Sequence, residues 1–269
     1  MALQSRRRLT QLIHQAVQEQ PLNKAFLTDL MAAIELNDLR NRHKPSQHYK
    51  PSSFVCLRQM YFMRVGEEPD QIRTAYNAIG MADTGTRRHE AIQEVLIKME
   101  SLGFDWRYVD VEEYLGGMWA QHKCLDIEVV GKRGAETKLY HKTLNMMFMC
   151  DGIIQRISTG KYYLFEFKNQ VSFKYTNKTD VDAEHKHQVA CYCMALELDD
   201  VLVVYENRDT CELECPVVLH ITPSMKQAVM EKIFECESYV ERLVPPPMHS
   251  NTKPCRWCQY QTACRKAGK

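Results

Sequence analysis

Two carboxylate residues and a lysine stand close together in the middle of the sequence, in a pattern that could carry hydrolytic chemistry. Asp151 comes first, and the tripeptide Glu166-Phe167-Lys168 begins 15 residues later. Two carboxylates can bind a hard divalent cation, and a nearby lysine can orient a water molecule for attack on a phosphodiester while the cation neutralises the developing charge. The alternative for a Glu-x-Lys tripeptide on a strand is an exposed ion pair without catalytic importance.

The segments around these residues predict the strands that must position them. Residues 146–157 and 161–169 are mostly apolar or aromatic, and a Ser-Thr-Gly turn lies between them, which predicts an antiparallel hairpin. Because side chains alternate along a strand, Glu166 and Lys168 should project to one face. The phenylalanines that flank Glu166 should project to the other face and enter the core. The hairpin would bring Asp151 beside the charged pair.

Two predicted helices carry polar residues that fit the same site. A helix over about 183–198 holds Gln188 and Tyr192, which share a helical face because they are four residues apart. A second helix, over about 84–102, begins at a Thr-Gly-Thr cap and ends at a glycine. Its apolar stripe consists of Ile92, Val95, Leu96 and Met99. His89 lies at the inner edge of this stripe, where a lone histidine is usually a core residue with satisfied hydrogen bonds.

The order of these motifs resembles that of RecB-like nucleases of the PD-(D/E)xK superfamily. The motifs are T-G-x-x-x-H ending at His89, C-D-G around Asp151, E-F-K from Glu166 to Lys168, and Q-x-x-x-Y from Gln188 to Tyr192. The resemblance covers roughly residues 54–264. One departure is that Cys150 precedes the aspartate, where the superfamily name has a proline.

This resemblance implies a role for each site residue. It implies a divalent cation held by three side chains and one main-chain carbonyl, those of His89, Asp151, Glu166 and Phe167. Lys168 would position the nucleophilic water, and Gln188 and Tyr192 would contact the scissile phosphate or the strand near it. The cation would be Mn²⁺ or Mg²⁺, and an imidazole among carboxylates shifts the preference toward manganese.

The sequence contains eleven cysteines, and three of them form a C-x2-C-x5-C motif in the C-terminal tail. These are Cys255, Cys258 and Cys264, and Cys56 is the expected fourth ligand. Their spacing alone is equally compatible with structural zinc and with an iron-sulfur cluster. The tail is too polar and too short to fold on hydrophobicity alone, so something else must hold it. Linking Cys56 to the tail closes a loop of about two hundred residues, which should make loss of the bound group destabilising.

The cysteine pattern also resembles that of iron-sulfur members of the same superfamily. In AddB, in CRISPR-adaptation nucleases and in similar eukaryotic single-strand exonucleases, a 4Fe-4S cluster attaches the tail to the segment before the core. The resemblance implies such a cluster here. Five other cysteines have apolar neighbours and are interpreted as core residues: Cys124, Cys150, Cys191, Cys193 and Cys236. Cys211 and Cys215 flank a predicted turn and are a weaker candidate for a second metal site.

Several segments could contact nucleic acid. The stretch at 169–187 interleaves Phe173 and Tyr175 with two lysines, Lys174 and Lys178, which suits stacking of unpaired bases and contact with a phosphate backbone. An ordinary solvated loop without a ligand is an equally good interpretation of this stretch. Among the local clusters of basic residues, Arg87 or Arg88, beside His89, is a better candidate for contacting phosphate than Arg6, Arg7 and Arg8 at the N-terminus.

The bulk composition neither demands nor excludes a nucleic-acid partner. Thirty-five basic and thirty-four acidic residues nearly cancel over 269 residues. The basic N-terminus lacks the apolar region of a signal peptide, and no apolar run is long enough to span a bilayer. We therefore expect a soluble protein without membrane partners in the cytoplasm of a bacterial, archaeal or phage-infected cell.

Together these patterns predict an α/β fold with a restriction-endonuclease-like core. We expect a mixed central sheet of about five strands flanked by helices. The expected divisions are a helical N-terminal extension at 1–53, the nuclease core at 54–244 and an iron-sulfur tail at 245–269. The predicted function is metal-dependent, exonucleolytic hydrolysis of DNA from single-stranded ends, by a homo-oligomer or within a DNA-processing complex. The alternatives are a catalytically silent DNA-binding or assembly subunit and a nuclease whose tail is held by zinc.

Overall fold

A computed structural model describes residues 22–41, 46–70, 74–121, 126–134, 136–176, 178–249, 255 and 258–268. The chain divides into two compact units. The N-terminal unit comprises residues 1–44 and 71–84, and the main unit comprises residues 45–70 and 85–269. The predicted first helix, the arginines at positions 6 to 8 and Cys124 lie outside the described residues.

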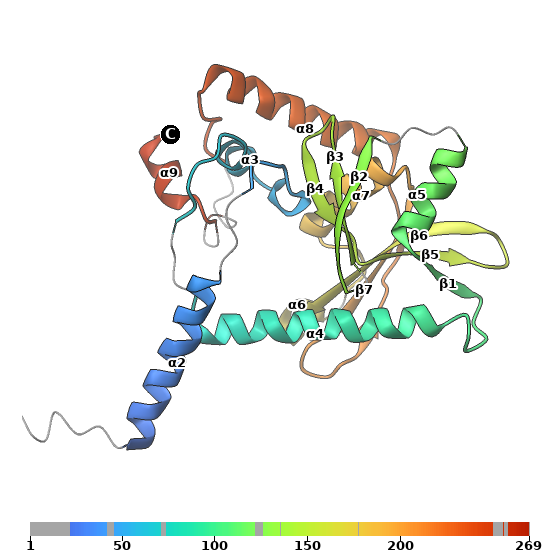
Figure 1. Cartoon of the computed structure of the whole chain (residues 1–269), viewed down its shortest axis with the longest axis horizontal. Coiled ribbons are helices and arrows are strands. Elements are labelled where there is room, and N and C mark those ends of the chain that lie inside the picture. Colours follow the sequence, from blue (N-terminus) through green and yellow to red (C-terminus); the bar gives the residue numbers. More distant parts are fainter. Residues whose placement is uncertain are drawn as a thin grey trace, which may run out of the picture. The chain divides into compact units, whose positions relative to one another are not determined.

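The N-terminal unit contributes one described helix of its own, α2 (Leu22–Arg40), coloured blue in Figure 1. Within this unit the backbone amide of Tyr76 donates to Glu35 Oε1 at 3.0 Å. The described part of the chain contains no helix that is long and apolar enough to cross a membrane.

The main unit is built on a mixed sheet, which confirms the predicted α/β class. Its strands are β1 (Trp106–Val109), β5 (Gly152–Arg156), β6 (Lys161–Gln170), β7 (Asp200–Asn207), β8 (Leu213–Glu214) and β9 (Val218–His220). The sheet order is β1-β5-β6-β7-β8, and β9 also pairs with β7. Only β6 and β7 run parallel. The predicted hairpin corresponds to β5 and β6, with Gly152 opposite Phe165.

A second sheet was not predicted. It has three strands, β2 (Ile127–Arg133), β3 (Glu136–His141) and β4 (Met146–Met149), in the order β2-β3-β4. The segment 146–157, predicted as one strand, is therefore two. Its first part pairs with β3 up to Met149, and its second part pairs with β6 from Gly152 onward. Asp151 consequently lies where the chain passes from one sheet to the other (Figure 1).

The other described helices belong wholly or partly to the main unit. They are α3 (Leu57–Arg64), α4 (Tyr76–Lys98), α5 (Val111–Ala120), α6 (Ser172–Tyr175), α7 (Ala183–Leu196), α8 (Pro223–Arg242) and α9 (Gln261–Lys266), and η1 (Pro51–Ser53) is a 3₁₀ turn. Residues of α3, α5, α7, α8 and the second sheet form the large core. A smaller core forms where α4 packs on Phe165, Phe167 and Ile154. Both phenylalanines that flank Glu166 therefore enter a core, as alternation predicts.

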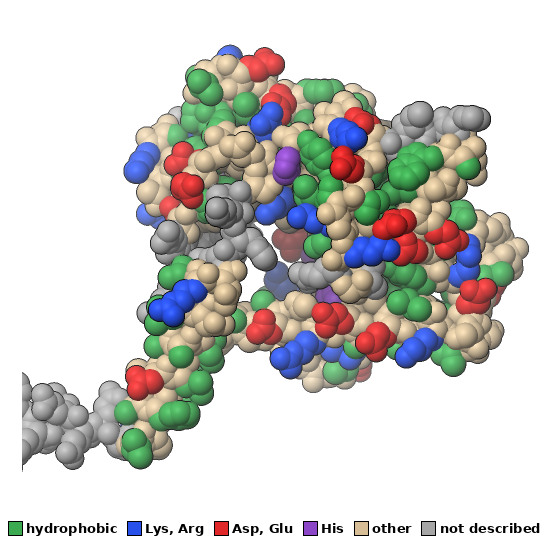
Figure 2. All heavy atoms as spheres, in the orientation of Figure 1, with side chains coloured by type: hydrophobic (Ala, Val, Ile, Leu, Met, Phe, Trp, Pro, Cys, Tyr) green, Lys and Arg blue, Asp and Glu red, His purple; other side chains and the backbone are tan. Residues whose placement is uncertain are grey.

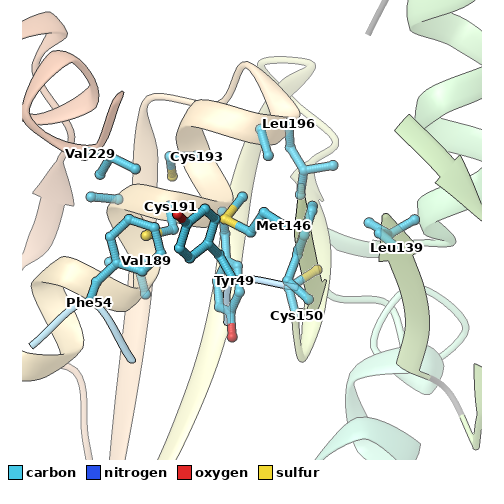
Figure 3. Packing of buried hydrophobic residues seen from close by; sticks show 14 of the residues in the cluster. Tyr49, Phe54, Leu139, Met146, Cys150, Val189, Cys191, Cys193, Leu196 and Val229 are labelled. Atoms are coloured by element: carbon cyan, nitrogen blue, oxygen red, sulfur yellow. The ribbon is translucent and has the colours of Figure 1, made fainter. Parts of the chain in front are cut away.

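Four of the cysteines interpreted as core residues are indeed buried, namely Cys150, Cys191, Cys193 and Cys236. Figure 3 shows the sulfurs of Cys191 and Cys193, both on α7, among hydrophobic side chains that include Val189 and Val229. Burial raises the pKa of Cys193 to about 12. These thiols therefore stay protonated and act as small apolar side chains.

The start predicted for the helix that carries His89 is wrong. The Thr-Gly-Thr segment does not cap a helix, because α4 already begins at Tyr76. The residues from 76 to 83 include good helix formers and no proline, so the helix continues through them. The hydroxyl of Thr84 donates to the carbonyl of Gly80 at 2.9 Å, as threonine does inside a helix. In the predicted apolar stripe, Val95 is exposed, and Gln93 is buried in its place.

Candidate active site and cysteine cavity

Asp151 is held by backbone and side-chain groups from two neighbouring elements. Its Oδ2 accepts a hydrogen bond from the backbone amide of Phe167 at 2.7 Å, so the side chain continues the pairing between β5 and β6. Its own carbonyl accepts from Nε2 of the buried Gln93 at 2.8 Å. The ring of Tyr108 packs on Gly152, where a Cβ atom would lie 2.7 Å from Cε2 of that ring. The glycine of the C-D-G motif therefore has a packing role beside the aspartate.

His89 comes to Asp151 from α4. Its Nδ1 lies 3.2 Å from Asp151 Oδ1, and its ring packs edge-on against Phe167 at a centroid distance of 5.0 Å. Burial works to lower the pKa of His89, but the hydrogen bond and the charge of Asp151 outweigh it, so the pKa is raised. The histidine and the aspartate, 62 positions apart in the sequence, thus form one pair of potential cation ligands.

Glu166 and Lys168 lie on the same face of β6. Lys168 Nζ donates to Glu166 Oε1 at 2.5 Å, and their side chains are 18% and 2% exposed, respectively. Glu166 Oε2 is fully buried and has no hydrogen-bond partner among the residues that the structure describes. Burial, together with the charge of Asp151, raises the pKa of Glu166 to about 7 despite the opposing charge of Lys168. A buried carboxylate oxygen without a partner is costly unless it binds a cation or a proton.

Gln188 and Tyr192 extend from α7 to the same carboxylate. Gln188 Nε2 donates to Glu166 Oε1 at 3.1 Å, and it also lies 2.7 Å from the hydroxyl oxygen of Tyr192. The Tyr192 ring stacks on Phe148 with its centroid 5.6 Å away, and the side chain is buried. Burial raises the pKa of Tyr192 well above its usual value. Tyr192 is therefore a neutral hydrogen-bonding group beside the carboxylates.

Glu136 is a site residue that the sequence did not reveal. One ligand atom from each of His89, Glu136 and Asp151 lies within 4.8 Å of the others. Glu136 is the first residue of β3, in the second sheet, and no motif marks it. The only sequence signal is the alternation of polar and apolar residues after it, which is too short to predict a strand. We call these side chains the carboxylate site: His89, Glu136, Asp151, Glu166, Lys168, Gln188 and Tyr192.

The two arginines expected to contact phosphate, Arg87 and Arg88, differ in whether they already form an ion pair. Arg88 is paired, because its Nε lies 3.0 Å from both carboxylate oxygens of the fully buried Glu206. Glu206 also accepts from Asn169 Nδ2 at 2.7 Å. Arg87, the other candidate, has no such ion pair among the described residues. On the face shown in Figure 2, acidic and basic side chains are interspersed along α4, as the near-zero net charge suggests.

The loop after β6 is partly available to a ligand. Phe173 is 93% exposed, and the Lys174 side chain is 60% exposed. Lys178 differs, because its side chain is only 7% exposed and its Nζ lies over the ring of Tyr205, 4.5 Å from the centroid. It also donates a hydrogen bond to Asp182. Of the two predicted lysines, Lys174 is therefore the one that can meet a nucleic acid.

The four predicted cysteine ligands line one small cavity of about 20 Å³. We call this the cysteine cavity, formed by Cys56, Cys255, Cys258 and Cys264. Among the residues that the structure describes, no cysteine belongs to a group of three or more potential ligands whose donor atoms all lie within 4.8 Å of one another. Burial raises the pKa of Cys258, and the charges of the other three cysteines add to this effect. The four thiols are free and line the same cavity.

The tail reaches this cavity through bonds to residues near the start of the main unit. The carboxylate of Asp70 accepts from the backbone amide of Thr262 at 2.9 Å, and the amide of Asp70 donates to the carbonyl of Gln259 at 2.6 Å. The rings of Phe62 and Tyr260 lie 6.0 Å apart beside the cavity. Tyr260 and Ala263 are buried, so the tail contributes to the large core despite its polar sequence.

The comparison with known proteins shows remote structural similarity. No family model matches the sequence, and no curated protein matches it. The crystal structure of SSO0001, an archaeal protein, matches 91% of this chain and 98% of that chain, with 15% sequence identity and a TM-score of 0.39. What the two sites can do chemically therefore follows from the chain's own side chains.

Proposed function

We propose that this chain is a metal-dependent DNA nuclease with a restriction-endonuclease-like core of the RecB-like kind. One observation carries the proposal: the fully buried Glu166 leaves a carboxylate oxygen without a partner, in a site shared with Asp151, His89 and Lys168. Most buried carboxylate oxygens in proteins have a hydrogen-bond partner. A bound cation would supply the partner of this oxygen.

The donor set suits a hard divalent cation. Ligand atoms of His89, Glu136 and Asp151 lie within 4.8 Å of one another. Glu166 and the main-chain carbonyl of Phe167 would be further ligands, as the motif resemblance implies. Oxygen donors with one imidazole fit Mn²⁺, with Mg²⁺ as the alternative. When bound, the cation would supply charge stabilisation at the phosphate and lower the pKa of a bound water.

The remaining residues would align the reaction. Lys168 lies 2.5 Å from Glu166, so its ammonium group can orient a water molecule at the carboxylate site. Burial works to lower the pKa of Lys168, but the charges of Glu166 and Asp151 outweigh it, so the lysine stays protonated and acts as a donor. Gln188 and Tyr192 are neutral donors that can bind a phosphate oxygen without opposing its charge.

Single-stranded DNA ends are the proposed substrate. Phe173 and Lys174 offer an exposed ring and a cation in adjacent positions on the loop that follows the catalytic strand. Unpaired bases expose π-faces that stack on such rings, whereas bases in a duplex do not. A preference for single strands therefore follows if this loop contacts the substrate.

We further propose that the cysteine cavity holds a 4Fe-4S cluster. A zinc ion bound by four thiolates would place neighbouring sulfurs about 3.8 Å apart, given a Zn–S distance of about 2.3 Å in a tetrahedron. The described cysteines form no group of three within 4.8 Å. Thiolates that bind separate irons of a cubane stand farther apart than thiolates that share one ion, so the wider spacing favours the cluster.

The test of the nuclease proposal compares two lysines on the same strand. Wild-type protein, Lys168→Ala and Lys161→Ala are each incubated with end-labelled single-stranded and double-stranded DNA and Mn²⁺. Lys161 lies at the start of β6, where its exposed side chain pairs with the mostly buried Asp200, and it serves as the matched control because it lies outside the carboxylate site. We expect wild type and Lys161→Ala to degrade single strands and Lys168→Ala to leave them intact.

Two outcomes would overturn parts of this proposal. Equal activity in all three proteins would remove Lys168 from the mechanism. Wild-type protein that cleaves no nucleic acid with any divalent metal, but binds DNA, would identify it as a silent binding or assembly subunit. Size-exclusion chromatography of the same samples would reveal any homo-oligomer.

A further inference from the structure

The most deeply buried arginine among the described residues lies at the cysteine cavity. Arg58, two positions after Cys56 on α3, is 3% exposed. Its Nη1 lies 3.4 Å from the Cys264 sulfur and 3.3 Å from the Cys264 carbonyl oxygen, and it donates to the Gly268 carbonyl at 2.8 Å. Its Nε donates to the Pro246 carbonyl at 2.8 Å. One guanidinium thus binds both ends of the tail and one of the sulfurs.

The charge of Arg58 has no carboxylate to balance it within the described part of the chain. Its hydrogen bonds go to carbonyl oxygens and to sulfur, and no carboxylate lies at ion-pair distance. A guanidinium remains protonated in proteins, and a buried charge without a counter-charge is costly. Four thiolates around the cavity would supply that counter-charge. The arginine therefore fits a cavity that holds a negatively charged metal-thiolate centre and fits poorly a cavity of four neutral thiols.

We propose that Arg58 is a positioning residue for the centre bound in the cysteine cavity, an inference that rests on the proposed 4Fe-4S cluster. Its forked donors fix the tail over the cavity by binding the carbonyls of Pro246 and Gly268. Its bond to the Cys264 sulfur stabilises negative charge on that ligand. Since reduction adds negative charge to the cluster, this bond raises the reduction potential.

Arg64 provides a matched control on the same helix. Its Nε donates to Glu237 Oε1 at 2.8 Å, and it does not line the cysteine cavity. Both arginines make long-range bonds from α3, so both substitutions should cost some stability. Only the substitution at Arg58 should alter the properties of the cluster itself.

The experiment compares wild type with Arg58→Lys, Arg58→Met and Arg64→Met, all purified without oxygen. Three quantities are measured: iron per chain with visible absorbance, the rate of iron loss to a chelator, and the reduction potential by optical titration. We expect Arg58→Met to lose iron about tenfold faster than wild type, as removal of groups behind a metal ligand typically does. Its reduction potential should be lower. Arg58→Lys should have values between those of wild type and Arg58→Met, because lysine keeps the charge but cannot bind several carbonyls at once. Arg64→Met should match wild type in the rate of iron loss and in the reduction potential.

The outcomes separate this inference from the cluster proposal. Wild-type protein that contains zinc or no metal would overturn the cluster and, with it, the role of Arg58 in setting a potential. Wild-type protein with iron, together with Arg58 variants of unchanged potential and unchanged iron retention, would leave the cluster standing and overturn this inference. If Arg58→Met fails to fold, the reduction potential of Arg58→Lys tests the inference, because replacing an arginine with a purely structural role would not change that potential.

Discussion

The carboxylate site and the cysteine cavity gather their ligands by different means. At the carboxylate site, Asp151 directly precedes β5 and Glu166 lies on the neighbouring strand β6, whose backbone amide at Phe167 fixes the Asp151 side chain. Lys168 and His89 already balance part of the negative charge. At the cysteine cavity, about two hundred residues separate Cys56 from the tail, and the tail is short.

Because of this difference, the carboxylate site should matter mainly for catalysis and the cysteine cavity mainly for stability. Strand pairing forms the carboxylate site whether or not a cation is bound, so loss of the cation should cost activity and little stability. The tail has few apolar contacts of its own, so the group bound in the cysteine cavity should contribute strongly to stability. Substitutions in the two regions should therefore have opposite signatures.

The largest expected effect is on catalysis. Asp151→Asn keeps an oxygen that can accept from the Phe167 amide, but it removes the charge that would bind the cation. We expect cleavage of single-stranded DNA to fall about a thousandfold, comparable to the loss of a key charge-stabilising group. Iron content and the denaturation midpoint should stay near those of wild type. A variant that loses its iron as well would show that the two regions are not separable.

The next largest effect is on stability, which the preceding substitution should leave unchanged. Cys258→Ser should remove a ligand and release the constraint on a loop of about two hundred residues, lowering the free energy of unfolding by about 4–5 kcal/mol. Cys215→Ser, at an exposed cysteine far from the motif in sequence, is the control and should change little. Urea denaturation followed by circular dichroism measures both. Equal stability of the two variants would mean that the tail is held without a bound group.

A pH dependence should mark the carboxylate site in metal-free protein. Burial raises the pKa of Glu166 from its ordinary value of 4.5 to about 7. A carboxyl whose pKa is raised by folding contributes fully to stability below about pH 4.5, and this contribution is lost as the pH rises through 7. We expect a loss of about 1–3 kcal/mol across this window.

Glu166→Gln should remove most of that loss, because glutamine does not ionise. Chemical denaturation at several pH values, without added divalent cations, measures the difference between the two proteins. An identical pH slope in both would show that folding does not raise the pKa of Glu166. Binding of Mn²⁺ should release a proton from Glu166, so its affinity should increase with pH up to about 7.

Local patterns predicted the hairpin of β5 and β6 and helix α7, because turn residues mark the hairpin and no proline or glycine interrupts the helix. They also indicated that the phenylalanines beside Glu166 are buried. The second sheet escaped prediction, since β3 and β4 are short and their register depends on partners. The extension of α4 toward Tyr76 was missed because a Thr-Gly-Thr segment reads equally well as a cap and as a helix interior.

For the functional residues too, prediction from local sequence patterns reached only those that lie within motifs. Residues within motifs, such as Asp151 and Lys168, could be found because their spacing follows the strands. Arg58 and Glu136 could not, because each acts on residues that only the folded chain brings near. The Cys264 sulfur lies 206 positions from Arg58, a separation that no local pattern spans.

Glu136 gives the smallest expected effect and tests how far the carboxylate site extends beyond its motifs. It is half-buried, and one of its oxygens lies within 4.8 Å of ligand atoms of His89 and Asp151. We expect Glu136→Gln to weaken Mn²⁺ binding by about tenfold, at the lower end of the range for removal of a supporting group around a metal. Glu128→Gln, on the adjacent strand β2, is the control, because Glu128 pairs with Lys142 at the surface. Titration followed by the electron paramagnetic resonance of free Mn²⁺ measures both affinities. Equal binding by the two variants would restrict the cation ligands to the residues of the main sheet and α4, and would leave the second sheet as a packing element alone.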